Sequence, residues 1–454
     1  MAAILFLIVV VILLTVKVPI AFAMAGPAMV YFVVADGVTI NIAFQRLAAA
    51  LNSFPLLAVP LFILIGYIAN GSGIAKRLVD FATLIAGRVR GRLAYANVST
   101  SVVFSWMSGT SLADAAALGA ILVPSMRDQG YKESFSVGLT AASSIIGPVM
   151  PPSIAAIIYG VTAEVSIGGL FLAGVIPAFL MAAMLGTQAL VSVRSGRAFA
   201  ERASSAGSMG TYSSRDSTMS GASARPEVDV SEAGQSSSLT IIWRAAPALL
   251  TPIIVIGGIL GGVFTPTEAA AVASAYLVLL TIVYRSLSLR SLLNTFVDAA
   301  RTTAQIGLIV GSGALFAFII AREGLTGSVV LWIDDRVSSP LVFLIGLNIF
   351  LLGLGTVLDT VSSLIVTVPV ALPAAVAVGV DPLHLGIVMV LNLGIGSITP
   401  PIGFILYVLS GVTGLSVGIV VKGVLPFLVT LLCALALVTW LPFLSLWLPG
   451  AGGL

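Results

Sequence analysis

Two copies of one turn motif, far apart in apolar sequence, constrain the fold of this chain most. Gly-x-x-x-Pro-Pro occurs at residues 147–152 and again at residues 396–401, an offset of 249 residues. The same offset relates three further pairs, Pro124 and Pro373, Gly130 and Gly379, and Pro177 and Pro426. A repeat of this kind indicates that the two halves are copies of one structural unit.

The composition predicts that the chain lies in a lipid bilayer. Its mean hydropathy is +1.15, and only 9% of its 454 residues are charged. Soluble proteins carry roughly 25% charged residues, so a large buried core does not explain the difference. We therefore expect an all-α membrane protein that crosses the bilayer many times. The net charge of +3 indicates no nucleic-acid partner, and the single cysteine, Cys433, excludes a disulfide framework.

A helix needs about 20 apolar residues to cross a bilayer, and this length divides each half into five expected spans. The run at residues 3–16 is interpreted as a retained span and not as a signal peptide, because Lys17 follows the apolar run instead of preceding it. The first half is expected to cross near residues 3–16, 18–36, 54–70, 94–123 and 168–192. The second half is expected to cross near residues 245–263, 267–284, 302–321, 340–372 and 423–448.

Between the fourth and fifth spans of each half lies a segment that carries the Pro-Pro motif, at residues 132–163 and 382–412. Each has two arms of about a dozen residues, too short to cross the bilayer separately, so we expect two re-entrant hairpins with Pro-Pro at their tips. Five crossings is an odd number, which makes the second copy enter from the opposite face. The pattern therefore predicts two inverted repeats, as in secondary transporters.

The expected units are residues 1–193 and 244–454, joined by a polar linker at residues 194–243. Residues 195–240 are rich in Ser, Ala, Gly and Arg, and we expect them to be disordered. With both termini in the periplasm, 16 of the 21 Lys and Arg residues fall on the cytoplasmic side, as the positive-inside rule requires. The five that fall outside are Arg46, Arg127, Lys132, Arg322 and Arg336.

Small polar residues interrupt two of the expected spans. Ser-Gly-Thr-Ser occupies residues 108–111, and its last serine has capping-box spacing to Asp114. In the second half Gly-Leu-Gly-Thr occupies residues 353–356, and its threonine has the same spacing to Asp359. The two boxes lie about one helical turn away from the offset of 249, so they are matched by pattern. We expect broken helices around a protein-lined cavity, with the two aspartates as equivalent caps.

A helix that begins inside the membrane directs its N–H groups and a partial positive charge at the cavity, whereas the preceding half-helix presents free carbonyl oxygens. The first suits a carboxylate, and the second suits Na⁺, which takes oxygen ligands. The expected substrate-binding residues are Ser108, Gly109, Thr110, Ser153, Gly355, Thr356 and Thr399. The expected sodium-binding residues are Asp114, Ser143, Ser144, Gly147, Pro148, Pro151, Asp359, Gly396, Ser397 and Pro400.

Several polar residues also have a purely structural interpretation. Asp114 and Asp359 are expected first of all to cap half-helices, because a charge at the bilayer centre costs at least about 2.5 kcal/mol. Asn97, Asn348 and Asn392 are expected to form hydrogen bonds between helices.

Three further segments are expected to shape the membrane faces. Residues 40–52 and 288–300 mix apolar and polar side chains and are expected to lie at the membrane surface as amphipathic helices. Residues 265–268, Thr-Pro-Thr-Glu, have the pattern of a capping box at a helix start.

Six motifs are spread over both halves. They are SGTSLAD at residues 108–114, PSMRDQGY at 124–131, IGPVMPPS at 146–153, TPTE at 265–268, GVDPLHLG at 379–386 and NLGIGSITPPIG at 392–403. Taken together, these motifs resemble the large membrane subunit of tripartite ATP-independent periplasmic (TRAP) transporters. The linker at residues 195–240 is longer than this family's pattern.

The resemblance implies a Na⁺-driven importer of C4-dicarboxylates or related organic acids in the inner membrane of a bacterium. It implies an elevator-type movement of a domain that bears the hairpins. It also implies two partners, a small membrane subunit of about four spans and a soluble periplasmic binding protein that delivers the substrate. The family's sodium sites, at the hairpin tips and the facing helix breaks, correspond here to the surroundings of Gly109 and Gly147 and of Gly355 and Gly396.

Three other interpretations stand beside this one. A self-sufficient Na⁺/dicarboxylate symporter or ion antiporter would transport without partner proteins. An intramembrane enzyme would need a Ser/His pair, paired aspartates or a zinc motif, whereas His384 is the sole histidine and Asp114 and Asp359 are isolated in sequence. Inverted repeats with helix breaks favour alternating access over an ion channel.

Overall fold

The computed structural model describes residues 2–16, 18–35, 37–85, 91–199, 238–336 and 339–452. Residues 200–237, most of the expected linker, lie outside this part, as do Lys17 and residues 86–90, which hold two of the arginines predicted to be cytoplasmic. Within the described part the chain is helical, apart from one isolated antiparallel bridge between Tyr131 and Phe199.

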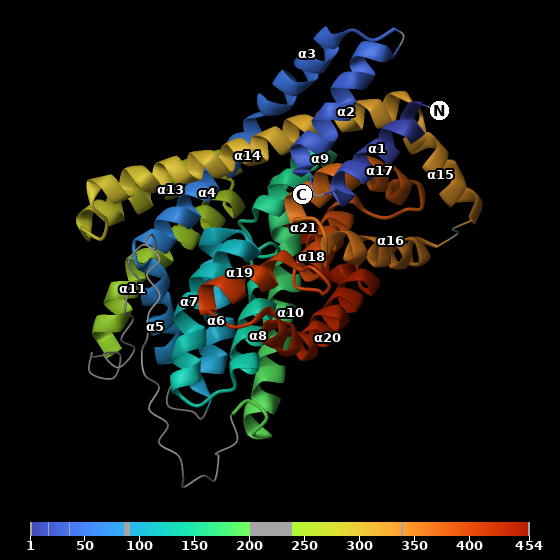
Figure 1. The fold of residues 1–454 in the computed structure, drawn as a ribbon. Helices are drawn as coiled ribbons and strands as arrows, with labels where there is room; N and C mark the ends of the chain where they lie inside the picture. The colour runs from blue at the N-terminus through green and yellow to red at the C-terminus, as the bar shows by residue number, and fades with distance from the viewer. Residues whose placement is uncertain are drawn as a thin grey trace, which may run out of the picture.

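Ten α-helices are described in the first half (Figure 1). They are α1 (Ala2–Thr15), α2 (Ile20–Val34), α3 (Ile40–Leu51), α4 (Ala58–Gly71), α5 (Ile74–Ile85), α6 (Arg92–Ser108), α7 (Ser111–Asp128), α8 (Glu133–Ser144), α9 (Ile154–Ala163) and α10 (Ile167–Arg194). A single 3₁₀ turn at Phe54–Leu57 leads into α4.

Eleven α-helices are described in the second half. They are α11 (Ser238–Pro252), α12 (Gly258–Leu260), α13 (Pro266–Val283), α14 (Leu289–Arg322), α15 (Leu325–Arg336), α16 (Pro340–Gly355), α17 (Thr360–Ala377), α18 (Pro382–Gly396), α19 (Phe404–Thr413), α20 (Val417–Trp440) and α21 (Phe443–Ala451). A π-helical turn at Ile253–Gly257 separates α11 from α12.

Six helical stretches in the described part are long and apolar enough to cross a membrane, judged by length and composition. They are Phe54–Gly71, α10, α13, α14, α17 and α20. Ten spans were expected; α1 and α2 are shorter than such a span, and the expected spans at residues 94–123 and 340–372 are each divided into two helices. The chain is therefore an all-helical polytopic membrane protein.

Two expected boundaries are wrong. The amphipathic segment 288–300 and the span 302–321 form one helix, α14, of 34 residues. No proline interrupts this stretch, so the helix continues across the change from polar to apolar sequence. The expected last span, residues 423–448, is instead divided at Leu441 and Pro442 into α20 and α21.

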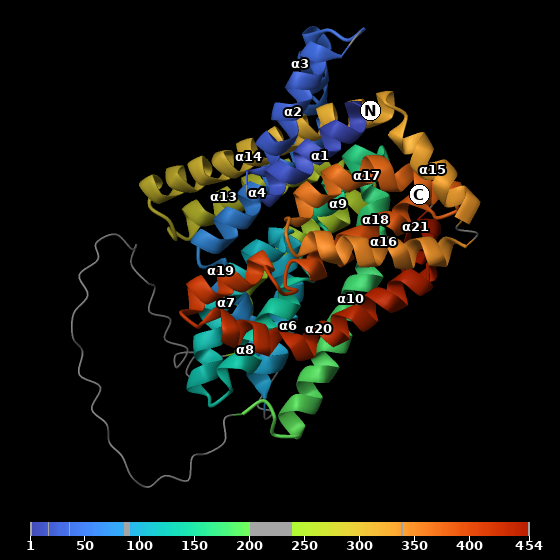
Figure 2. The same ribbon diagram turned by 45° about the vertical axis from the view of Figure 1, so that its right-hand side comes forward.

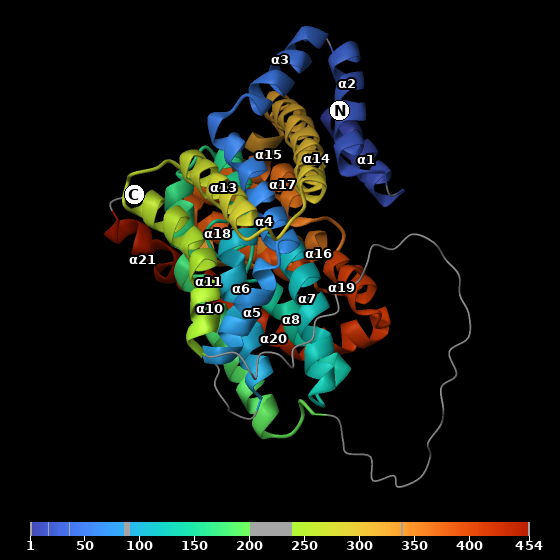
Figure 3. The same cartoon turned by 90° about the vertical axis from the view of Figure 1, so that its left-hand side faces the viewer.

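The long helix α14 packs along α2, α3 and α4, while α13 packs against α4 and α11 packs against α5 (Figure 1). Turning the molecule keeps α1, α2 and α3 beside α14, as Figures 2 and 3 show. The hairpins and broken helices form the other contacts, with α8 against α20, α7 against α19, α16 against α18 and α9 against α17. Three of these contacts, α8 with α20, α7 with α19 and α9 with α17, join helices from different halves of the chain.

The chain leaves its helical path at both Pro-Pro motifs and at both predicted helix breaks, but the expected hairpins are wrong. Residues 132–163 run antiparallel along the whole of α10, since the N–H of Lys132 donates to the carbonyl of Ala198 and Val149 lies against Gly174. Helices α8 and α9 therefore follow one another as one interrupted helix, and so do α18 and α19, whereas α6 and α7, and α16 and α17, fold back beside each other (Figures 1 and 2). The hairpins thus have the predicted helix breaks at their tips, because a Pro-Pro motif interrupts a helix without reversing the chain. The Pro-Pro peptide bonds, at Pro151-Pro152 and Pro400-Pro401, are both cis.

The offset of 249 holds through the helix breaks, contrary to the expected shift of one turn. It separates Ser111 from Thr360, where α7 and α17 begin, and Asp128 from Ala377, where they end. Helices α8 and α18 also begin 249 residues apart. Under this offset Asp359 corresponds to Thr110, not to Asp114, and Asp114 corresponds to Ser363.

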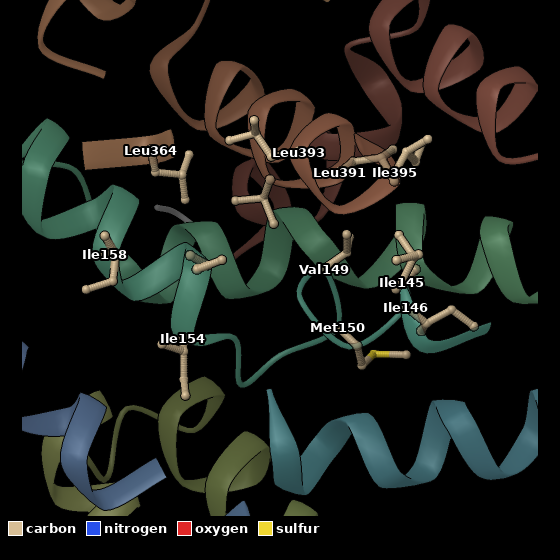
Figure 4. Packing of buried hydrophobic residues seen from close by; sticks show 14 of the residues in the cluster. Ile145, Ile146, Val149, Met150, Ile154, Ile158, Leu364, Leu391, Leu393 and Ile395 are labelled. Atoms are coloured by element: carbon tan, nitrogen blue, oxygen red, sulfur yellow. The ribbon is translucent and has the colours of Figure 1, made fainter. Parts of the chain in front are cut away.

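The first Pro-Pro segment, residues 145–153, packs into apolar side chains of the second half. In Figure 4, Ile145 and Val149 of this segment lie beside Leu391 and Ile395 of α18, and all four side chains are buried. The contact is close, because a Cβ atom added at Gly394 would lie 3.1 Å from Cγ2 of Ile145.

The predicted role of the buried asparagines is confirmed. Asn97 on α6 donates to the hydroxyl of Thr140 on α8 at 2.7 Å and accepts from the hydroxyl of Ser143 at 2.9 Å. Asn392 on α18 donates to the amide oxygen of Asn348 on α16 at 2.7 Å. Since a bilayer supplies no water to pair such groups, these bonds fix α8 to α6 and α18 to α16.

Candidate functional site

A cavity of about 430 Å³ lies where the helix breaks meet the first Pro-Pro segment. Its walls come from α4, α14, both breaks, the first Pro-Pro segment with the start of α9, and the start of α19. The residues that line it are Ile63, Gly66, Tyr67, Asn70, Ser108, Gly109, Thr110, Ser111, Leu112, Ala113, Ala116, Pro148, Ile154, Ala155, Thr302, Ile306, Asp359, Thr360, Val361 and Phe404. This volume is within the range of small-molecule sites.

The cavity brings together some of the predicted residues and leaves others out. Ser108, Gly109, Thr110, Pro148 and Asp359 line it. The other predicted residues do not line it: Asp114, Ser143, Ser144, Gly147, Pro151, Ser153, Gly355, Thr356, Gly396, Ser397, Thr399 and Pro400.

The sequence analysis missed the opposite wall of the cavity. Tyr67 and Asn70 on α4 and Thr302 on α14 line that wall, and the hydroxyls of Tyr67 and Thr302 lie 2.9 Å apart. These are polar side chains within otherwise apolar spans. That placement was the available signal, because polar residues inside a membrane span tend to face a cavity or another helix.

The first helix break has a different cap from the one expected. Thr110 is the N-cap of α7, and its hydroxyl accepts from the N–H of Ala113 at 3.3 Å. Gly109 ends α6 in the left-handed region, with φ of 60°. The expected box from Ser111 to Asp114 is wrong, because the Asp114 carboxylate is bonded to two serines of α6 instead.

The second helix break also has a different cap. The expected box from Thr356 to Asp359 is wrong, since Asp359 is itself the N-cap of α17 and accepts from the N–H of Ser362 at 3.1 Å. The Ser362 hydroxyl donates to the other oxygen of the same carboxylate. Thr356 ends α16, and its hydroxyl donates to the carbonyl of Gly353 at 2.8 Å. Asp114 and Asp359 thus occupy different positions relative to the helix that follows each break.

Asp114 is completely buried among oxygen atoms. The Ser105 hydroxyl lies 3.0 Å from Oδ2 of Asp114, and the Ser108 hydroxyl donates to Oδ1. From Ser105 a chain of buried hydrogen bonds continues, because this hydroxyl also lies 2.5 Å from the carbonyl of Ser101, whose own hydroxyl donates to Ser143 at 2.8 Å. A carboxylate in this position needs positive charge beside it or a proton on it, since burial of an unpaired charge is costly.

The backbone fastens each Pro-Pro segment to the neighbouring helix break. The N–H of Ile154 donates to the carbonyl of Gly109 at 3.3 Å, and the N–H of Gly403 donates to the carbonyl of Thr356 at 3.1 Å. Gly147 lies against the first break, where an added Cβ would be 2.7 Å from Oδ2 of Asp114.

The second junction is equally close. A Cβ added at Gly396 would be 2.7 Å from Cα of Gly355. The structure therefore brings Gly147 to the first break, where Gly109 lies, and Gly396 to Gly355, the two groupings that the family resemblance implied.

Most of the other predicted hydroxyls are bonded within their own segment. Ser144 donates to the carbonyl of Ala141 at 2.8 Å, Ser397 to Gly394 at 2.5 Å and Thr399 to Ile395 at 2.7 Å. Ser153 caps α9 by accepting from the N–H of Ala156 at 3.0 Å, and its hydroxyl donates to the carbonyl of Pro148. These hydrogen bonds stabilise the local conformation of the two Pro-Pro segments, and the hydroxyl oxygens keep lone pairs for a further contact.

We expect Gly109→Ala to lower transport activity at least tenfold. The added Cβ would lie 2.6 Å from the carbonyl oxygen of Pro152, a backbone atom in the first Pro-Pro segment. Gly130→Ala is the matched control, because Gly130 also has a positive φ, of 84°, but no atom lies within 4 Å of its added Cβ. Both variants carry the left-handed backbone cost of about 1 kcal/mol. Equal activity of the two variants in an uptake assay would show that the close approach of Gly109 to Pro152 is unimportant for transport.

Comparison with known proteins agrees with this geometry. Residues 7–444 match the family model described as "Tripartite ATP-independent periplasmic transporter, DctM component". The chain is 38% identical over 432 residues to the sialic acid TRAP transporter large permease protein of Vibrio cholerae, covering 95% of this chain and 94% of that protein. It is 35% identical to the C4-dicarboxylate TRAP transporter large permease protein of Pseudomonas aeruginosa, covering 87% and 86%.

A solved structure supports the fold alone. The YdaH transporter of Alcanivorax borkumensis superposes with a TM-score of 0.63 at 15% identity, over 97% of this chain and 98% of that one. The family model and the relatives cover nearly the whole chain. The chain therefore belongs to the DctM family, the large permease component of tripartite ATP-independent periplasmic transporters.

Proposed function

We propose that this chain imports organic acids through the membrane, coupled to Na⁺. The acid would occupy the cavity of about 430 Å³ between the two helix breaks, where α7 and α9 begin. Helix N-termini inside a membrane protein attract anionic groups, because their N–H groups are unpaired and their dipoles are positive. The named relatives act on sialic acid and on C4-dicarboxylates, which are carboxylates.

The observation that carries the proposed coupling is the junction around Asp114. The carboxylate and the hydroxyls of Ser105 and Ser108 form an oxygen cluster beside Gly147. Oxygen donors with one negative charge fit Na⁺, and a bound cation would supply the charge that the buried Asp114 lacks. The second junction, between Gly355 and Gly396, is the corresponding candidate for a second ion.

We further propose the architecture and partners that the family description implies. The two halves would be inverted repeats, and the hairpins with the broken helices would move as one body against α4 and α14. The repeated helix bounds and the cavity between these two groups of elements support this movement. The chain would lie in a bacterial inner membrane with both termini in the periplasm. It would work with a small membrane subunit and a periplasmic binding protein.

The test is uptake into proteoliposomes that contain the chain with its small subunit. A radiolabelled panel of C4-dicarboxylates, keto acids and sugar acids is offered with and without the binding protein, under an inward gradient of either Na⁺ or K⁺. Uptake that needs both Na⁺ and the binding protein is expected. Uptake without the binding protein would favour a self-sufficient symporter, and equal uptake under K⁺ would remove the sodium assignment.

A further inference from the structure

The charge along the cavity wall is uneven. On the side of the first half, α7 and α9 begin at neutral caps, Thr110 and Ser153. On the side of the second half, α17 begins at the carboxylate of Asp359, which lines the cavity. Lys, Arg and His do not occur among the described residues that line it. The cavity therefore has one side suited to an anion and one side that carries an anion itself.

Asp359 compensates the positive end of its own helix. Both of its oxygens are used, one by the N–H of Ser362 at 3.1 Å and one by the hydroxyl of Ser362. The positive end of α17 is thus already paired with a negative charge and has little attraction left for a substrate carboxylate. A second carboxylate on the substrate, brought to this side, would meet a like charge in a region of low dielectric.

Beside Asp359 lies a hydroxyl that has no hydrogen-bond partner in the described structure. Thr360 is only 8% exposed, its Oγ1 is unpaired, and the residue lines the cavity. A buried polar atom of this kind is costly to leave unsatisfied. A neutral donor or acceptor on the substrate, such as a hydroxyl group, would pair with it without adding charge.

The wall from α4 and α14 is also neutral and polar. The hydroxyls of Tyr67 and Thr302 are in contact at 2.9 Å, and the exposed amide of Asn70 can both donate and accept. The cavity, at about 430 Å³, has the volume of about fourteen water molecules at roughly 30 Å³ each. A C4-dicarboxylate has only about eight non-hydrogen atoms and would leave much of this space to water.

We infer that the cavity selects acids with a single carboxylate and several hydroxyl groups, the chemistry of sugar acids, over C4-dicarboxylates. The carboxylate faces the starts of α7 and α9, and the hydroxyls face Thr360, Tyr67 and Asn70. This inference rests on the proposed function, because it assigns a substrate class to the same cavity. Asp114 also lies in the first turn of α7, but the Na⁺ proposed to bind beside it would compensate its charge in NaCl, so the start of α7 remains able to attract the substrate carboxylate.

The experiment measures binding to the chain purified with its small subunit, without the binding protein, so that the cavity alone selects. Thermal stabilisation in saturating NaCl is titrated with D-gluconate, succinate and butyrate. D-Gluconate should bind at least tenfold more tightly than succinate, because succinate brings a second charge towards Asp359. Butyrate, which has one carboxylate and no hydroxyl, should bind more weakly than D-gluconate.

Asp359→Asn tests the charge directly. Asparagine is as good an N-cap as aspartate, so α17 should still form. The ratio of succinate to D-gluconate affinity should rise at least tenfold in this variant. Asp298→Asn is the control, since Asp298 is exposed, pairs with Arg301 and lies outside the cavity; its ratio should not change. Tyr67→Phe should weaken D-gluconate binding and leave butyrate binding unchanged.

The outcomes distinguish a failure of the inferred selectivity from a failure of the proposed carboxylate site. If succinate binds the wild-type chain as tightly as D-gluconate, or if Asp359→Asn leaves the ratio unchanged, the inferred selectivity is wrong while carboxylate transport stands. If none of the three acids stabilises the chain in NaCl, both the selectivity and the placement of a carboxylate in this cavity are overturned.

Discussion

Asp114→Asn should abolish Na⁺-driven uptake, with a loss of at least a hundredfold. Asparagine has the shape of aspartate and still offers an oxygen to the hydroxyls of Ser105 and Ser108, so the junction between α6 and α7 should be kept. The negative charge is lost, and the amide adds a donor where a cation would sit. The oxygen cluster then no longer balances a bound Na⁺.

Two measurements separate this loss from misfolding. The wild-type chain should melt at a higher temperature in NaCl than in KCl, because a ligand that binds only the folded state stabilises it. The Asp114→Asn variant should show the same melting temperature in both salts, close to that of the wild type in KCl. Asp298→Asn should behave as wild type in both assays. Sodium-dependent stabilisation that survives in Asp114→Asn would remove Asp114 from the ion site.

Gly423→Ala should strongly destabilise the fold. Gly423 on α20 lies against the backbone of α8, where an added Cβ would overlap the carbonyl of Ser134. Gly138 faces the same crossing from α8 and would overlap the carbonyl of Gly423. Since both obstacles are backbone atoms, the helices have to separate, at a cost of about 3 kcal/mol or more.

The matched control lies on the same helix. Gly418 has no atom within 4 Å of an added Cβ, so Gly418→Ala should leave the melting temperature unchanged or raise it through helix propensity. The two variants are compared by folded yield on size-exclusion chromatography and by thermal unfolding in detergent. Equal melting temperatures would show that α8 and α20 adapt to a methyl group at their crossing.

Much of the fold could be predicted from local sequence. The Pro-Pro pairs and the clusters of small residues mark the points where helices are interrupted, because proline and glycine disfavour helix interiors, but they do not show which interruption reverses the chain. The buried asparagines were also predictable, since an amide in a bilayer needs a partner on another helix. The motifs that point to the family are likewise local.

The details of the caps could not be predicted in the same way. Thr110 and Ser111 are both good N-caps, and only the turn taken after Gly109 decides that Thr110 is used. The match between Asp114 and Asp359 was misleading because the two residues occupy different positions relative to the helix that follows each break. The wall formed by Tyr67, Asn70 and Thr302 depends on the packing of α4 against α14, a contact between distant segments that no local pattern reports.

Helix α14 has a consequence for the lipid that surrounds the protein. At 1.5 Å per residue its 34 residues extend for about 51 Å, whereas the hydrocarbon layer is about 30 Å thick. The helix therefore has to lean steeply or run partly along the membrane surface, and the thickness of the bilayer acts on its tilt. Thr302 and Ile306, in the middle of this helix, form part of the cavity wall. We therefore expect the acyl-chain length of the surrounding lipid to affect the tilt of α14 and, through Thr302 and Ile306, the shape of the cavity.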